Sequence, residues 1–187
     1  YYQCSNHAGM GGQANTNSTF GSSNFSGSIQ ANVSVNTTAG FSIVSYTGNG
    51  TAGATVGHGL GAVPQMFIVK DRTSGTSNDW FIYNTNIGAT KYLELNDTDE
   101  ARTSSTLWND TDPTSSVFTL GNNSNINTNT NTLIAYCFAE KKGFSRFGSY
   151  VGNGSSDGSY IHLGFSASFF MIKSSSTAED WNIIDNT

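Results

Sequence analysis

Charged residues are scarce in this chain and absent from residues 1–69. Asp, Glu, Lys and Arg make up 11% of the 187 residues, whereas they make up about 25% of an average soluble domain. The first charged side chain is that of Lys70, and the net charge is −5. Nucleic-acid binding requires a basic patch, which this composition does not supply. We therefore predict that the chain does not bind nucleic acid.

Long apolar runs, prolines and cysteines are also few. No apolar run reaches the length of about 18 residues that a membrane span needs, so membrane insertion is not expected. The two prolines exclude a proline-rich linker, and the glycines lack the three-residue period of collagen. The two cysteines, Cys4 and Cys137, are too few for a disulfide framework. Cys137 lies in the apolar run LIAYCFAE, and we interpret it as a buried free thiol.

Short β-strands are predicted from Gly40 onward. Apolar and polar residues alternate in FSIVSYT at 41–47. Further apolar runs of strand length recur at intervals of about 10 to 15 residues, with Gly, Asn and Ser turns between them. No stretch shows a helical period with caps. We predict an all-β fold, an antiparallel β-sandwich of the jelly-roll or lectin-like kind, with an extended N-terminal arm.

The N-terminal region divides into two parts. Residues 13–39 are rich in Ser, Asn, Thr and Gly and are predicted to be a linker or extended arm, whose tail IQANVSV alternates and would suit an edge strand. Residues 1–12 hold Cys4, His7 and Met10 at C-x-x-H-x-x-M spacing. A thiolate, an imidazole and a thioether are three of the four ligands of a blue-copper site. The second histidine is missing from this stretch, so the copper-type set is incomplete.

An internal repeat is the most informative feature of the sequence. GFSIVSYTGNG at 40–50 returns as GFSRFGSYVGNG at 143–154. At similar offsets His58 corresponds to His162, MFIVK at 66–70 to FFMIK at 169–173, and Trp80 to Trp181. Because the histidine recurs with the repeat, we interpret its role as structural rather than catalytic. We interpret the recurring tryptophans as core residues.

The repeat defines the predicted domain organisation. Residues 40–142 are one β-sandwich unit, and residues 143–187 are the first strands of a second unit. Two arrangements stay open at this point, because the second copy would either begin a second sandwich or supply strands that finish the first. Tandem β modules of this kind stack on their neighbours and indicate architecture rather than chemistry.

Three stretches contain residues that could bind calcium or a sugar. NDTD occurs at 96–99 and again at 109–112, where turns are the expected structure and calcium binding is the alternative. Asn125, Asn127 and Asn129 recur at period two, so in a strand they would share a face that could meet a sugar, and in a loop they would not.

Trp108 is the tryptophan predicted to be exposed. It lies in STLWNDTDPTS, among turn-forming residues, and is therefore our candidate for stacking on a glycan. Signatures of catalysis are absent, including a nucleophile elbow, a phosphate loop and paired CxxC motifs. We predict that the chain is not an enzyme and needs no cofactor, with copper and calcium as the only metals considered.

The stretches GFS…YTGNG, VGHGLG…P and IAYCFAExxGFSxFGSYxGNG carry a family resemblance. They resemble β-rich modules in virion structural proteins of tailed bacteriophages, especially marine and cyanobacterial ones, and YYQCSNHAGMGG looks like the end of a cupredoxin-like module found in some of them. The resemblance covers residues 40–187 and residues 1–12. It implies a tail-fibre or spike-type appendage at the virion surface, and it brings no catalytic residues.

Three functions follow as expectations. The first is a phage appendage protein that forms a homo-oligomer, a trimer above all, contacts other virion proteins and attaches to a host-surface glycan or protein. The second is a self-assembling extracellular filament or adhesin subunit, joined by strand addition of the arm at 13–39. The third is a blue-copper-like metal protein that uses Cys4, His7 and Met10.

Overall fold

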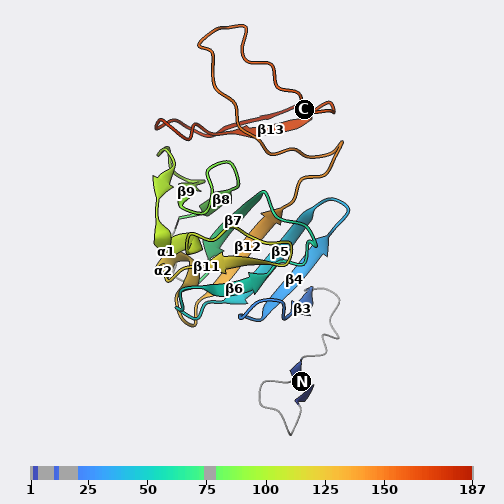
Figure 1. The fold of residues 1–187 in the computed structure, drawn as a ribbon, viewed down its shortest axis with the longest axis vertical. Helices are drawn as coiled ribbons and strands as arrows, with labels where there is room; N and C mark the ends of the chain where they lie inside the picture. The colour runs from blue at the N-terminus through green and yellow to red at the C-terminus, as the bar shows by residue number, and fades with distance from the viewer. Residues whose placement is uncertain (1, 4–10, 13–20, 74–78, 187) are drawn as a thin grey trace.

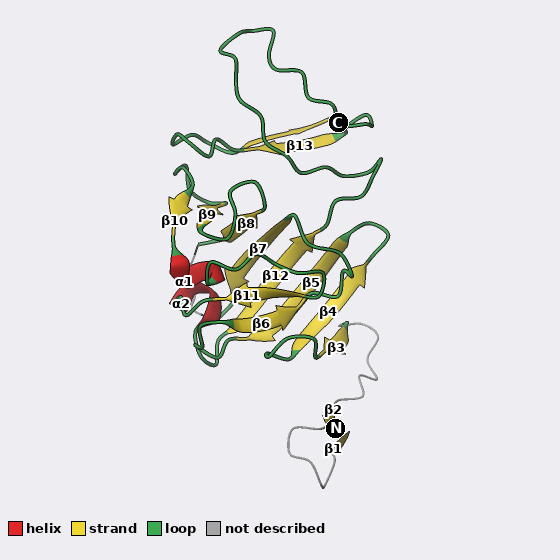
Figure 2. Ribbon diagram, in the orientation of Figure 1, coloured by secondary structure: helices red, strands yellow, loops and turns green. Residues whose placement is uncertain are grey.

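The computed structural model describes residues 2–3, 11–12, 21–73 and 79–186, and its regular elements are mostly β-strands (Figures 1 and 2). The elements in chain order are β1 Tyr2–Gln3, β2 Gly11–Gly12, β3 Ser22–Asn24, β4 Ala31–Asn36, β5 Phe41–Thr47, β6 Ala54–Gly57, β7 Met66–Asp71, β8 Phe81–Asn84, β9 Lys91–Glu94, β10 Arg102–Thr103, α1 Ser105–Trp108, β11 Val117–Leu120, α2 Ser124–Asn127, β12 Thr132–Phe138, β13 Phe169–Ile172 and β14 Asn182–Asp185.

Eight strands form one antiparallel sheet in the order β10-β9-β8-β7-β12-β5-β4-β3. β12 comes late in the chain but inserts between β7 and β5, and it pairs with both along its length. The alternation predicted for 41–47 turns Ser42, Val44 and Tyr46 of β5 into the core. β12 buries every second residue in the same way.

A smaller layer covers the inner face of this sheet. It consists of the pair β6–β11 and the short helices α1 and α2 (Figure 2). Phe67 of β7 lies at the centre of the core, with ring centroids 4.7 Å from Tyr83, 4.9 Å from Phe118 and 4.9 Å from Trp108. Two unequal β layers around one core confirm the prediction of an all-β antiparallel sandwich. Neither of the helices in the described residues is long and apolar enough to cross a membrane.

The sheet begins before Gly40, inside the stretch predicted to be a linker or arm. β4 pairs with β5 over six residues, and β3 pairs with β4 at the sheet edge. Ala31 and Val33 are buried on the inner face, and Ile29 forms a bridge with Val56 of the smaller layer. The described part of residues 13–39 is therefore held in its own sandwich, because its alternate apolar residues fit the pleat. Residues 13–20 lie outside the described residues.

Candidate functional site

The hairpin β13–β14 reproduces in the second repeat copy the strand pairing of β7–β8 in the first. All four pairs of the first hairpin have their repeat counterparts paired in the second. Met66–Asn84, Phe67–Tyr83, Ile68–Ile82 and Val69–Phe81 correspond to Phe169–Asp185, Phe170–Ile184, Met171–Ile183 and Ile172–Asn182. The two hairpins therefore share one register, and the sequence repeat is also a structural repeat.

The second hairpin does not extend the large sheet. It forms a two-stranded sheet of its own, which lies across the β8–β9 end of the first unit (Figure 1). Residues 143–168 form no strand, although their counterparts at 40–65 contain β5 and β6. β5 has partner strands on both edges, whereas no described strand lies beside 144–150. An alternating pattern without a partner strand does not form a sheet.

The hairpin covers an apolar patch on the outer face of the large sheet. Ile68, Ile82 and Leu93 point away from the main core and are 9%, 0% and 6% exposed. Met171 and Trp181 of the second repeat pack against their cluster, together with partly buried side chains of the first repeat, among them Trp80 and Tyr136. Burying apolar side chains in this way is worth about 25 cal/mol per Å² of area removed from water. We call this contact, together with the polar contacts around residues 94–102, the repeat joint.

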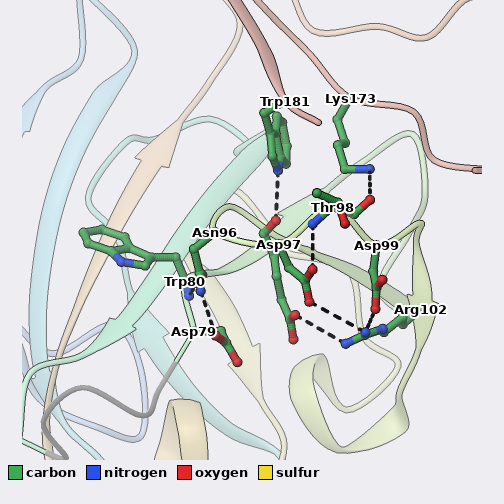
Figure 3. A network of polar contacts seen from close by, with 10 residues as sticks. Asp79, Trp80, Asn96, Asp97, Thr98, Asp99, Arg102, Lys173 and Trp181 are labelled. Carbon is green, nitrogen blue, oxygen red and sulfur yellow. Dashed lines mark hydrogen bonds and ion pairs between the residues drawn. The ribbon is translucent and has the colours of Figure 1, made fainter. Parts of the chain in front are cut away.

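Backbone groups of β9 and of the loop after it form the polar part of the repeat joint (Figure 3), including the N–H of Ala101, which donates to the carbonyl oxygen of Ser175. The indole Nε1 of Trp181 donates to the carbonyl oxygen of Glu94 at 2.9 Å. The carbonyl oxygen of Thr98 accepts both from Nζ of Lys173 at 3.1 Å and from the backbone N–H of Glu179 at 2.8 Å. The second repeat thus binds to backbone atoms of this segment, and these hydrogen bonds form only if the segment keeps one conformation.

Arg102 holds the loop in that conformation. Its guanidinium pairs with Glu94 at 3.3 Å, with Asp97 at 3.7 Å and with Asp99 (Figure 3). The carboxylates of Asp97 and Asp99, in the first NDTD stretch, therefore face the guanidinium of Arg102. No group of three or more His, Cys, Asp or Glu side chains in the described ranges is placed to hold a metal ion.

Glu94 is the most buried carboxylate of this cluster. Its residue is 8% exposed, and burial raises the pKa of its carboxyl group, as does the negative charge of Asp79. The positive charge of Arg102 opposes this rise in pKa. The side chain of Glu94 therefore belongs to the charged cluster of the loop, while its backbone carbonyl oxygen accepts from Trp181 of the second repeat.

The second NDTD stretch is also a turn. Asn109 and Asp110 adopt left-handed backbone conformations, with φ values of 54° and 47°. The carboxylate of Asp112 accepts from the hydroxyl of Tyr83 at 3.0 Å and from the backbone N–H of Ala89 at 3.1 Å. These short polar side chains close the helix α1 and orient the following loop.

His58 is fully buried beside the smaller layer. Its Nε2 lies 3.1 Å from the carbonyl oxygen of Thr114, and its Nδ1 accepts from the backbone N–H of Leu60 at 3.2 Å. These partners fix a neutral ring that donates from Nε2. Burial lowers the pKa of His58. The repeat counterpart His162 is exposed, so the two histidines share a sequence position and not an environment.

Trp108 was predicted to be exposed, and this prediction is wrong. The residue is 0% exposed, its ring packs edge-on against Phe67, and its Nε1 donates to the carbonyl oxygen of Lys91 at 3.1 Å. It ends the helix α1, whose first turn is capped by the side chain of Ser104. The four-residue helix turns the indole inward, so it cannot stack on a surface glycan.

The three asparagines predicted at period two do not lie on one strand face. Asn125 and Asn127 belong to the helix α2, in which period two separates side chains. Asn127 is fully buried, Asn125 is half-buried and Asn129 is exposed. The three therefore form no common sugar-binding row. The signal for the helix was the capping asparagine Asn123, whose side chain accepts from the N–H of Asn125.

The copper-type candidates cannot be placed. Cys4, His7 and Met10 lie outside the described residues, although the flanking strands β1 and β2 pair with each other. Cys137 is described, and the expectation of a buried free thiol is confirmed: it is 0% exposed and forms no disulfide. Burial raises the pKa of this thiol to about 12.

The sequence analysis missed an uncharged polar surface on the outer face of the large sheet. We use the name polar platform for its outward-facing polar residues Asn32, Ser34, Asn36, Ser45 and Thr47. The apolar residues Phe41 and Ile43, which pair with Asn36 and Ser34, lie on the same face. These five polar residues come from the paired strands β4 and β5. Ser45 is half-buried, and the other four are exposed. The signal was the alternation of IQANVSV, from which an edge strand was predicted without a role for its polar face.

These features define a β-sandwich with a hairpin of a second repeat copy packed on its outer face, and with a buried structural histidine in its core. Residues 13–187 match a family described as a domain of unknown function, DUF7483, and the chain belongs to that family. Neither the curated proteins nor the solved structures yielded a match to the chain.

Proposed function

We propose that the chain is a structural module of an extracellular appendage, of the tail-fibre or spike type found on virions. The observation that carries the proposal is the repeat joint: Trp181 of the second copy closes an apolar patch on the outer face of the first. Modules that bury surface against their neighbours build long, stiff objects. The sequence resemblance to phage structural modules supports the virion setting, the extracellular location and a trimeric homo-oligomer with other virion proteins as neighbours.

Host attachment is the second part of this proposal. The polar platform offers amide and hydroxyl groups without charge, and such groups form the weak hydrogen bonds by which proteins hold sugars. Attachment through weak contacts gains strength when many copies engage together. The partner proposed is therefore a host-surface glycan or protein, bound by avidity. No described residue supports a catalytic role in this proposal.

Strand addition by residues 13–39 is less favoured as a means of assembly. The described part of that segment already pairs with β5 of its own sheet through β4. It is therefore not free to complete a neighbouring chain.

Two measurements test the proposal. Antibodies raised against the chain should label appendages of particles made from the source genome, and labelling confined to other parts of the particle would refute the appendage role. Beads that display the chain should bind host cells and a glycan array. Asn32→Glu combined with Thr47→Glu should abolish this binding, whereas Ser156→Glu in an exposed loop should leave it unchanged.

A further inference from the structure

The second repeat contacts the repeat joint with the outer face of its own hairpin. The side chains that make this contact are those of Met171, Lys173 and Trp181. Their counterparts in the first copy are the outer-face residues Ile68, Lys70 and Trp80. Ile183, which pairs with Met171, is 58% exposed, so the contact lies at the turn end of the hairpin. The same face of the fold therefore lies on both sides of the joint.

The first sandwich also carries the groups that receive this face. The carbonyl oxygens of Glu94 and Thr98 accept the side-chain hydrogen bonds of the joint. Glu94 of β9 pairs with Phe81 of β8, so the first of these acceptors lies next to Trp80 in the same sheet. The first sandwich therefore contains both halves of the joint: a donor half at Lys70 and Trp80, and an acceptor half in β9 and the loop after it.

The donor half of the first copy is held in place by aromatic contacts. The ring of Trp80 stacks on that of Tyr136, with ring centroids 6.3 Å apart and 20° between the ring planes. Nζ of Lys70 lies 5.7 Å from the centre of the Trp80 ring. Both Lys70 and Trp80 are half-buried. Side chains that are already ordered lose less conformational freedom when they bind a partner.

We propose that this outer face is self-complementary, and that the partner it takes is the same face of another copy of the repeat, docked about a two-fold axis. An isologous contact of this kind requires both halves of the interface on each side, so that residue i contacts residue j and residue j contacts residue i. In such a pair, Trp80 of each copy donates to the carbonyl oxygen of Glu94 in the other, as Trp181 does in the joint. The inference rests on the proposed structural role and names the partner of the face.

The contact has a form within one chain and a form between two chains. In the structure the hairpin of the second copy occupies the face. Linkage raises the effective concentration of a copy on the same chain, which therefore competes at an advantage. Pairing between chains through the first copy is expected once the hairpin leaves the face. An isologous pair closes at two members, so a longer assembly needs a further surface.

The test releases the hairpin from the face in the intact chain. Met171→Asp combined with Trp181→Asp sets two carboxylates against the apolar patch, and burying them there is unfavourable. Hydrogen exchange at the amide of Ala101, which donates to Ser175 across the joint, should then become faster. If this exchange stays slow, Lys173→Glu is added. Analytical ultracentrifugation of the released chain should show a discrete species with twice the mass of the native protein at the same concentration.

Two further variants distinguish a specific pair from non-specific association. Trp80→Phe keeps an aromatic ring but removes the indole N–H, so a two-fold pair loses two hydrogen bonds. In the released chain it should weaken association by about tenfold or more, and in the native chain it should leave the exchange at Ala101 slow. Val151→Asp, at an 88% exposed position outside the joint, is the matched control and should leave the mass of the released chain unchanged. Thermal unfolding checks that the first sandwich is intact in each variant.

Three outcomes would overturn the inference. A released chain that keeps the native mass has a face that does not bind itself. Irregular aggregates without a discrete species indicate an apolar surface that lacks self-complementarity. Association that Trp80→Phe leaves at full strength uses a different surface. Each of these failures leaves the repeat joint and the proposed appendage role standing, because antibody labelling tests that role separately. Failure of the labelling would in turn leave the mass measurement unaffected.

Discussion

Replacing Asn127 by Ala should destabilise the first sandwich severely, although asparagine is a common surface residue. Its amide Nδ2 donates to the carbonyl oxygens of Gly121 at 2.7 Å and of Thr51 at 3.0 Å. Its Oδ1 accepts from the backbone N–H of Asn49 at 3.0 Å. The side chain is fully buried, so it ties three backbone segments together where water has no access.

The expected loss of stability follows from these three hydrogen bonds. Each net hydrogen bond is worth about 0.5–1.5 kcal/mol, and a buried polar group left without its partner costs about 1–3 kcal/mol more. The free energy of unfolding should therefore fall by about 3–4 kcal/mol. For a domain of this size the melting temperature should fall by roughly 10 °C.

Thermal and urea unfolding of purified Asn127→Ala, followed by circular dichroism, measure this loss. Asn129→Ala is the matched control, because Asn129 is exposed two residues further on, and its effect should stay within about 0.5 kcal/mol. Asn127→Asp should lose at least as much stability as Asn127→Ala at neutral pH, because a carboxylate would face two carbonyl oxygens. A loss below about 1 kcal/mol for Asn127→Ala would refute the reasoning, since it would mean that these hydrogen bonds are replaced without cost.

Three further predictions concern titratable groups. Burial lowers the folded-state pKa of His58 below its unfolded value of about 6.5, so its contribution to stability is present above that pH and lost as the pH falls through the folded pKa. In urea unfolding at a series of pH values, His58→Gln should flatten this part of the stability–pH curve. An unchanged curve would contradict a lowered pKa for His58. Because the pKa of Glu94 is raised, its contribution is present below the unfolded pKa and lost as the pH rises through the folded pKa. The stability of Glu94→Gln relative to the native chain, measured by urea unfolding, should therefore rise as the pH is raised from acidic to neutral. If the difference in stability between the two proteins stays constant with pH, the ion pair with Arg102 fully offsets the effect of burial. In a Cys4→Ser background, Cys137 should react with iodoacetamide at the rate of global unfolding, because its thiol is buried and its pKa is about 12; rapid labelling of the folded protein would disprove its burial.

The strands were predictable from the sequence wherever one face alone is buried. Alternation in FSIVSYT identified β5, and the apolar runs MFIVK and LIAYCFAE lie largely within β7 and β12. The repeat also predicted the second hairpin, because residues that pair in one copy pair in the other. Periodicity and internal repetition can both be found in a single sequence without knowledge of tertiary contacts.

The helices and the joint were not predictable in the same way. Trp108 and Asn127 lie in helices of four residues each, which are too short to show a helical period. Their burial depends on the large sheet beneath them, which is assembled from strands distant in sequence. The contact between Trp181 and Glu94 likewise joins residues of different repeat copies. Such contacts follow from tertiary packing, and no local pattern specifies them.

The shortage of charge has a structural counterpart at the repeat joint. Five charged residues are concentrated in the nine residues at 94–102, and the Arg102 ion pairs all lie within the first repeat. Exposed ion pairs contribute little stability individually, but here they shape the loop that presents the carbonyl oxygen of Thr98. The contacts that cross the joint are apolar packing and hydrogen bonds to backbone carbonyls. Salt screens charge–charge attraction and leaves apolar packing and neutral hydrogen bonds largely unchanged. Charge therefore acts on the joint through the shape of this loop and through the ammonium of Lys173, which donates to the carbonyl oxygen of Thr98.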